Sequence, residues 1–397
     1  MTNFFHYEVL TWPEVSTLPR NTPLLLPLGT GYSHTYLAKV LDYPPQVGLL
    51  PPFPFGWEGS GLSVPDILLV AYMNNLLGGL EEDGFTRLFY VIPQMSAGLY
   101  PEGFRFPCIF SPQDEGICIQ RSTPLLQDQD HEKVVLVPIG HTEQHAFHLP
   151  LSTDTIIIDA ISQGVVNTAP KKSCKLPVVP YGVSMHRSSF AGTLSAGGRA
   201  FEDFWISVVN VLVERGFSMF YFMNGHGGNG SFLTNVVKYC GDKHRRIFCA
   251  TASLYLTSPE GINAVETHRR SKIGGMGHAC ELETSFILHL YPDLVHMERV
   301  VDETDFITTP SYYMDWVEGG ALVANPPWDD DTATGAYGAG SLGTAEHGRI
   351  WLNAAIEEKV SHINEIIEQQ KRREERRNGG YGLWTKKAKL LGENHEY

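Results

Sequence analysis

Runs of consecutive apolar residues form the first regular pattern along this chain of 397 residues. Residues 134 to 139 and 219 to 223 are continuously apolar, which is typical of parallel strands that are buried on both faces of a sheet. Near the end of the chain, apolar residues from Leu352 to Ile367 recur at helical spacing and predict an amphipathic helix. The pattern therefore predicts an α/β fold with a mostly parallel sheet flanked by helices.

Candidate metal ligands follow the first of these strands. Glu143 and His145 are two residues apart, so a turning backbone could direct both side chains at one ion, and Asp154 returns from a loop to meet them. Mixed carboxylate and imidazole ligands suit zinc, manganese or iron better than calcium or magnesium. A single Glu-x-His pair is more often a solvated surface feature, so this motif does not establish a metal site alone.

Two further clusters strengthen the metal hypothesis. The second apolar run leads into Asn-Gly-His-Gly-Gly-Asn at residues 224 to 229, where glycines allow a sharp turn that brings His226 close to a ligand. This loop lacks the Lys-Ser/Thr ending of a phosphate-binding loop. In the third cluster, His278 and Glu281 are three residues apart and would share one helical face. Glu283 can be explained by the preference for acidic residues at a helix N-terminus.

In order, spacing and residue type, the three clusters resemble the creatininase family of metal-dependent amidohydrolases over roughly residues 131 to 365. The family pattern runs from Glu-Gln-His, Leu-Pro and Asp to Asn-Gly-His and then His-Ala-Gly-Glu-x-Glu-Thr-Ser. The resemblance implies a three-layer creatininase-like fold. It also implies a set of metal ligands in which Asp154 bridges two ions: Glu143, His145, Asp154, His226 and Glu281.

The last ligand in this set depends on a departure from the family pattern. Creatinine-hydrolysing members carry a Glu two residues after the Asn-Gly-His histidine, where this chain has Gly228. We expect Glu281 to supply the missing carboxylate, with Glu283 as the alternative. His278 corresponds to the catalytic histidine of the family, which would orient the substrate carbonyl or protonate the departing nitrogen. Glu281 beside it is the second catalytic candidate.

The resemblance also implies the chemistry. Two divalent ions per chain, with zinc favoured over manganese or iron, would share a bridging hydroxide that attacks an amide carbonyl. No other cofactor is expected. Arg187 could pair with a substrate carboxylate or phosphate. The candidate substrate-binding residues are Ser184, Arg187, Gly227 and Trp316.

We therefore expect a hydrolase of C–N bonds other than typical peptide bonds, acting on a cyclic amide, a formamide or a small peptide-like amide in a specialised biosynthetic pathway. Creatinine itself is disfavoured, because residues 274 to 277 replace a tryptophan that precedes the catalytic histidine in creatinine-hydrolysing relatives. Two alternatives stay open. One is a peptidase that trims a short modified peptide, and the other is a non-catalytic binding or scaffold protein stabilised by metal.

Composition excludes several partners. A formal net charge of −14 argues against nucleic acid or an anionic membrane, since both require a basic face. The sequence has neither a membrane-spanning apolar run nor a secretory leader, and its six cysteines are dispersed, so we expect a cytoplasmic protein with reduced thiols. Family members assemble as rings of dimers, and the resemblance implies a homo-oligomer such as a hexamer.

The first hundred residues look like a shortened, degenerate copy of the domain that follows. When Gly29 is aligned with Gly140, His34 falls on His145, but Tyr32 stands in place of the first metal ligand. No metal is expected in this copy. The predicted organisation is a degenerate copy at residues 1–98, a linker at 99–130, a catalytic domain at 131–370 and a charged tail at 371–397.

Overall fold

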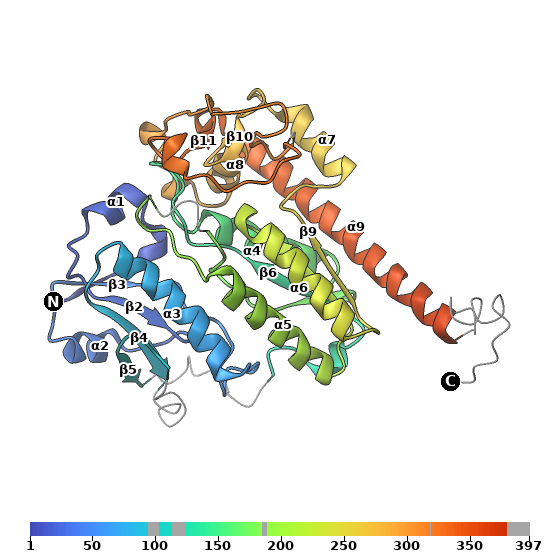
Figure 1. The fold of residues 1–397 in the computed structure, drawn as a ribbon, viewed down its shortest axis with the longest axis horizontal. Coiled ribbons are helices and arrows are strands. Elements are labelled where there is room, and N and C mark those ends of the chain that lie inside the picture. Colours follow the sequence, from blue (N-terminus) through green and yellow to red (C-terminus); the bar gives the residue numbers. More distant parts are fainter. Residues whose placement is uncertain (94–102, 113–123, 185–188, 318, 379–397) are drawn as a thin grey trace.

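The computed structural model describes residues 1–93, 103–112, 124–184, 189–317 and 319–378. Two neighbouring sheets dominate it (Figure 1), and every strand pair in both is parallel. The first sheet has the order β1-β3-β2-β4-β5, with β1 (Asn3–His6), β2 (Leu24–Pro27), β3 (Gln46–Leu49), β4 (Leu88–Pro93) and β5 (Cys108–Ser111). The second has the order β7-β6-β8-β9, with β6 (Val134–Ile139), β7 (Ser173–Lys175), β8 (Met219–Asn224) and β9 (Phe248–Ala252).

The two apolar runs are confirmed as buried parallel strands. They form β6 and β8, which pair with each other, and all their residues are buried. Because successive side chains of a strand point to opposite faces, Val135 and Val137 enter one hydrophobic core and Val134 and Leu136 enter another. The first core contains residues of α5 (Gly198–Glu214) and α6 (Gly230–Lys243), and the second contains residues of α4 (Thr153–Thr168) and α9 (Ala345–Asn378). The predicted three-layer arrangement is therefore confirmed.

The remaining helices cover the first sheet or gather at one end of the second. One face of the first sheet packs against α2 (His34–Val40), and the other lies against α3 (Asp66–Glu82) and α1 (Trp12–Thr17). Beyond the carboxyl ends of β6 and β8 lie α7 (Pro259–His268), α8 (Glu281–Leu290) and an antiparallel pair, β10 (Met276–His278) and β11 (Tyr337–Gly338) (Figure 1). None of the described helices combines the length and the apolar character needed to cross a lipid bilayer.

The two sheets share one hydrophobic core. Helices α3 and α5 pack against each other, and the core around them contains residues of both sheets. We call the part built on the first sheet, up to residue 112, the first unit, and the part from residue 124 onward the second unit. The Phe204 ring on α5 lies 5.5 Å from the Phe53 ring and 5.2 Å from the Tyr72 ring, both contributed by the first unit. The Tyr72 hydroxyl also donates a hydrogen bond of 2.7 Å to the carbonyl of Tyr181 in the second unit. The units are therefore joined by apolar packing as well as by the chain.

The strand order of the second sheet recurs in the first. The order β3-β2-β4-β5 corresponds to β7-β6-β8-β9, and β1 adds an edge strand. This correspondence is what a degenerate copy would produce, although the copy itself stays a prediction. Two boundaries differ from those expected. Strand β5 falls within the predicted linker because it completes the first sheet beside β4, and α9 extends through residues 371 to 378 of the predicted tail.

A buried ion pair connects α9 to the start of α7. Glu358 accepts hydrogen bonds from the backbone N–H groups of Thr257 (3.0 Å) and Ser258 (2.9 Å), and Lys359 Nζ lies 2.6 Å from its Oε1. Burial would raise the pKa of Glu358, but the adjacent Lys359 ammonium and the hydrogen bonds at Ser258 outweigh it and lower the pKa to about 2.

We expect Glu358→Gln to destabilise the protein by about 3 kcal/mol at neutral pH, because Lys359 would stay buried without a counter-ion. A lowered folded-state pKa contributes stability that is present above the ordinary value of 4.5 and lost as the pH falls towards 2. Urea unfolding as a function of pH measures both effects. The exposed neighbour provides the control, since Glu357→Gln should change stability by less than about 0.5 kcal/mol. Equal stabilities of the two variants would contradict this role for Glu358.

The shared core predicts that both units unfold together. We expect Phe204→Ala to cost about 3–5 kcal/mol, because it removes a buried ring that both units contact. Calorimetry should show one transition in the wild type and one, at lower temperature, in the variant. Tyr239→Ala, at a side chain that is 61% exposed, is the control and should leave the transition unchanged. Two separate transitions would show that each unit has an independent core.

Candidate metal centre

Buried polar side chains gather at the carboxyl ends of the two central strands of the second sheet. Glu143 and His145 follow β6, His226 follows β8, and Asp154 lies in the first turn of α4. Each is at most 2% exposed. From β6 the chain crosses to β7 on one side and returns to β8 on the other, so the cluster lies where the strand order reverses, the usual ligand position in such sheets.

Two glycines allow α4 to begin this close to the strand ends. A Cβ atom on Gly140 would lie 2.4 Å from the Cα atom of Thr155, and one on Gly225 would lie 2.8 Å from the Cβ atom of Ile158. Any larger residue at either position would displace the helix that carries Asp154. The glycines therefore bring that carboxylate within reach of both strand ends.

The carboxylate of Asp154 lies between two imidazoles. Its Oδ1 is 3.2 Å from His145 Nε2, and its Oδ2 is 3.0 Å from His226 Nδ1. The same His226 nitrogen is 3.1 Å from Oε1 of Glu143. Asp154 thus contacts the two imidazoles through different carboxylate oxygens.

The hydrogen bonds behind the histidines fix which ring nitrogen faces the carboxylates. His145 Nδ1 is 3.1 Å from the carbonyl of Glu143, and His226 Nε2 is 3.1 Å from the carbonyl of Val183. A carbonyl oxygen can only accept, so each of these nitrogens carries a proton, and the other ring nitrogen faces Asp154, where a bound cation would use its lone pair. This is the usual arrangement of metal-binding histidines, whose second nitrogen donates to a backbone carbonyl or carboxylate.

His278 shares this arrangement. It ends β10, and its Nε2 donates to the carbonyl of Gln144 over 2.7 Å, so Nδ1 faces the cluster and lies 3.7 Å from Oε1 of Glu143. Its ring also packs on the ring of His145, with centroids 4.2 Å apart. The sequence prediction that His278 and Glu281 share a helical face is wrong, because α8 begins only at Glu281.

The structure places Glu283, and not Glu281, at the cluster. An oxygen of Glu283 groups with ligand atoms of His145 and Asp154, all within 4.8 Å of one another. Glu281 instead accepts hydrogen bonds from the backbone N–H groups of Arg270 (2.9 Å) and Ser271 (2.7 Å). Residues two apart on a helix point in different directions, so only one of the two can face the cluster. Glu281 is therefore corrected from a metal ligand and catalytic residue to a residue that supports the loop before β10.

The position where relatives carry a Glu is sterically closed. A Cβ atom on Gly228 would lie 2.3 Å from the carbonyl oxygen of Val183 and 2.5 Å from Nε2 of His226. No side chain fits there while His226 keeps its hydrogen bond to Val183. Among the described residues, the carboxylate nearest to the cluster beyond Glu143 and Asp154 is that of Glu283 on α8.

Three further buried side chains contact the carboxylates of the cluster, and one of them, His141, forms a candidate metal-binding group with Glu143 and His226. Ser184, predicted to bind substrate, donates its hydroxyl to Oε2 of Glu143 over 3.0 Å, and the Tyr255 hydroxyl lies 3.2 Å from Oδ1 of Asp154. His141 Nδ1 accepts from the backbone N–H of Gly182, so its Nε2 carries a proton and faces Glu143 at 3.8 Å. Sequence reasoning missed His141, although it lies in the first motif, and nothing in the sequence singled out Tyr255.

The electrostatics of the cluster favour a cation. Burial alone would lower the pKa of His226, but the carboxylates of Glu143 and Asp154 outweigh it and raise this pKa to about 9. Glu283 adds a third buried carboxylate nearby. Carboxylate oxygens and imidazole lone pairs that converge in this way fit a divalent metal ion.

The backbone is strained beside two of the histidines. Ala146 and Ala279, which directly follow His145 and His278, have φ angles of 53° and 49°. Residues with a side chain rarely adopt this left-handed conformation, and it tends to persist where the surroundings enforce a functional geometry.

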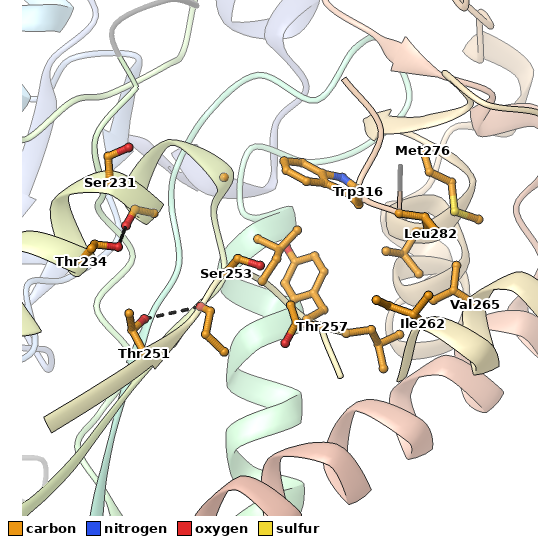
Figure 2. A pocket seen from close by; sticks show the side chains of 17 residues that line it. Ser231, Thr234, Thr251, Ser253, Thr257, Ile262, Val265, Met276, Leu282 and Trp316 are labelled. Carbon is orange, nitrogen blue, oxygen red and sulfur yellow. Dashed lines mark hydrogen bonds between the residues drawn. The ribbon is translucent and has the colours of Figure 1, made fainter. Parts of the chain in front are cut away.

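A cavity of about 420 Å³ lies between α6, α7, β9 and the segment around Trp316 (Figure 2), and it shares no lining residue with the cluster. Tyr255, which contacts Asp154, lies in its wall, and the predicted substrate-binding residues Gly227 and Trp316 line it. The remaining lining is apolar or carries hydroxyl groups, as in Thr251 and Ser253, and no lining side chain is charged. Arg187, the fourth predicted substrate-binding residue, lies outside the described residues.

Comparisons with known proteins identify the family of this chain. The family model Creatininase, described as creatinine amidohydrolase, matches residues 120–363. The mycofactocin precursor peptide peptidase of Mycobacterium ulcerans (strain Agy99) is 32% identical over 179 residues, which make up 42% of this chain. The chain spans only 62% of the length of that relative.

Two further similarities cover a larger share of the matched protein. The creatinine amidohydrolase of Pseudomonas putida is 26% identical over 192 residues, which are 45% of this chain and 72% of the relative. A crystal structure of a creatinine amidohydrolase (creatininase) aligns with a TM-score of 0.50 at 22% identity, covering 60% of this chain and 92% of that one. At this identity the structural similarity shows the fold alone.

The two glutamates of α8 should differ in their effect on metal. We expect Glu283→Gln to weaken metal binding by more than about 100-fold, because removing even an outer partner of a ligand costs 10- to 100-fold. Glu281→Gln keeps an acceptor oxygen for the loop and should retain the wild-type metal content. Elemental analysis of protein purified without added metal measures both. Equal losses, or a loss in the Glu281 variant alone, would contradict the placement of Glu283.

Proposed function

The chain belongs to the creatininase family, and on that basis we propose that it is a metal-dependent amidohydrolase that breaks a C–N amide bond. The observation that carries the proposal is the carboxylate of Asp154 between His145 and His226, each of which turns its second ring nitrogen towards that carboxylate. We propose that two ions bind there, with zinc favoured over manganese or iron. Glu143, His226 and Asp154 would hold one, and His145, Asp154 and Glu283 the other.

Divalent ions in this position would supply polarisation of the amide carbonyl and a lower pKa for the attacking water. The protein contributes orientation and proton transfer. Ser184 and Tyr255 hold the carboxylates of Glu143 and Asp154 by hydrogen bonds, so the ligands are fixed before substrate arrives. His278 Nδ1 faces the cluster, so in the neutral ring it can accept a proton and deliver it to the nitrogen that leaves.

The cavity lined by Tyr255 supports an uncharged substrate group. Its volume is within the range of small-molecule sites, and its walls combine apolar side chains with hydroxyl groups. A charged group would lose hydration there without gaining a counter-ion. We therefore propose that the part of the substrate next to the scissile amide is neutral, as in a lactam, a formamide or a small peptide-like amide.

A second candidate function is cleavage of a short modified peptide. The similarity to the mycofactocin precursor peptide peptidase favours it, because that relative shares 32% of its residues with this chain over the matched segment. An apolar or hydroxylated side chain would suit the cavity in this case as well. Residence in the cytoplasm and assembly into a homo-oligomer stay predictions of the sequence.

The role of His278 separates catalysis from metal binding. We expect His278→Ala to lower kcat by about 10²–10⁴, since that is the usual contribution of a positioned general acid or base, while the metal content stays at the wild-type level. Turnover is followed by mass spectrometry on a library of lactams, formamides and short peptides. His296→Ala, at a histidine that is not part of the cluster, is the control and should keep full activity.

Three results would count against these assignments. A variant at His278 that loses its metal would make this residue a ligand. A variant that keeps wild-type kcat would exclude it from proton transfer. If the fully metal-loaded wild type hydrolyses nothing in the library, the remaining hypothesis is a binding or scaffold protein that the metal stabilises.

A further inference from the structure

A second cavity, of about 510 Å³, lies in the first unit at the carboxyl ends of β2, β3 and β4. From β2 the chain crosses to β3 on one side and returns to β4 on the other, so the strand order reverses at this cavity. Ligands bind at such reversal points in open parallel sheets. The metal cluster occupies the equivalent position in the second sheet, at the ends of β6 and β8.

The backbone confirms that the two places correspond. Leu28 and Phe53 form an isolated parallel bridge just before Gly29, and Ile139 and Val179 form one just before Gly140. The N–H of Gly29 bonds to the carbonyl of Phe53 over 2.8 Å, and that of Gly140 to Val179 over 3.0 Å. The loop after Gly29 therefore leaves its sheet as the metal-binding loop leaves the second one.

The side chains in this crevice cannot reproduce the metal site. Tyr32 and His34 replace the glutamate and histidine of the metal loop, and no candidate metal cluster occurs among the described residues of the first unit. None of the lining side chains is an Asp, Glu, Lys or Arg. His6 at the rim lies 3.4 Å from the carboxylate of Glu8, which offsets any charge it takes up.

What lines the crevice instead suits a neutral ring compound. The ring of His34 lines the crevice and is stacked on that of Phe4, with centroids 4.3 Å apart and planes 11° from parallel, so the lining includes an aromatic ring held by a second one. Leu49 and Leu50 form an apolar floor, and Thr30, Ser33 and Thr35 supply hydroxyl groups. Hydroxyl groups hydrogen-bond an amide or another hydroxyl without requiring charge.

We propose that this crevice is a metal-independent binding site for an uncharged ring compound that carries amide or hydroxyl groups. The site does not depend on the proposed hydrolase activity, because it shares no residue with the metal cluster or its cavity. The first unit would then have lost the metal chemistry of the second while keeping its ligand-binding crevice.

Benzamide and benzoate form a matched pair of probes, because they share a ring and differ in charge. We expect benzamide to bind the full-length protein saturably in ligand-observed NMR, and benzoate to bind at least about tenfold more weakly. Thr35→Trp fills the crevice from the first turn of α2 and should weaken benzamide binding by at least about tenfold. Val40→Trp, at an exposed position of the same helix, is the control and should bind as the wild type does.

Three outcomes would overturn the proposal: no saturable benzamide binding, equal binding of benzoate, or equal binding in the two tryptophan variants. Thermal unfolding of each variant shows whether it is folded, and Thr30→Trp in the loop repeats the test if Thr35→Trp is destabilised. Turnover by the metal centre is measured on the same samples. Loss of benzamide binding with unchanged turnover separates this site from the proposed active site. If the protein hydrolyses none of the tested amides, the binding result still holds, because it does not depend on turnover.

Discussion

The close burial of three carboxylates is the constraint on which the second unit depends. Glu143, Asp154 and Glu283 are each at most 2% exposed and converge on the same histidines. Like charges in a low-dielectric interior repel strongly, so cations must offset them for all three to stay ionised. The surrounding structure holds them together, since Gly140 and Gly225 admit α4 and α8 supplies the third carboxylate.

Backbone carbonyls orient the histidine rings of this site. His145, His226 and His278 each donate a hydrogen bond from one ring nitrogen to a backbone carbonyl in a loop next to a central strand. The sheet therefore fixes the direction in which the other ring nitrogen points. The imidazoles are oriented before any ion binds, and little conformational freedom is lost on binding. The same loops carry the strained backbone at Ala146 and Ala279, which packing of the rigid sheet and helices can maintain.

Sequence reasoning reached the α/β fold, the two central strands and four residues of the cluster, because apolar runs and Glu-x-His and Asn-Gly-His spacings are local patterns. It favoured Glu281 over its alternative Glu283, because a spacing of three from His278 does not reveal that His278 ends a strand and that α8 begins at Glu281. It read β5 as linker because four residues at a sheet edge carry no clear period. Tyr255 and the shared core depend on contacts distant in sequence, which no local pattern encodes.

The packing of the first unit on the second also determines how the cluster is assembled. Immediately before α4, the N–H of Leu151 bonds to the carbonyl of Leu10 over 2.9 Å, and that of Ser152 to the carbonyl of Glu8 over 3.0 Å. The first unit thus braces the turn that precedes Asp154. Because both partners lie on one chain, their effective concentration is set by the covalent connection and does not fall on dilution. This bracing of the metal-binding loop is therefore the same at trace and at high protein concentration, which a brace supplied by a separate subunit could not guarantee.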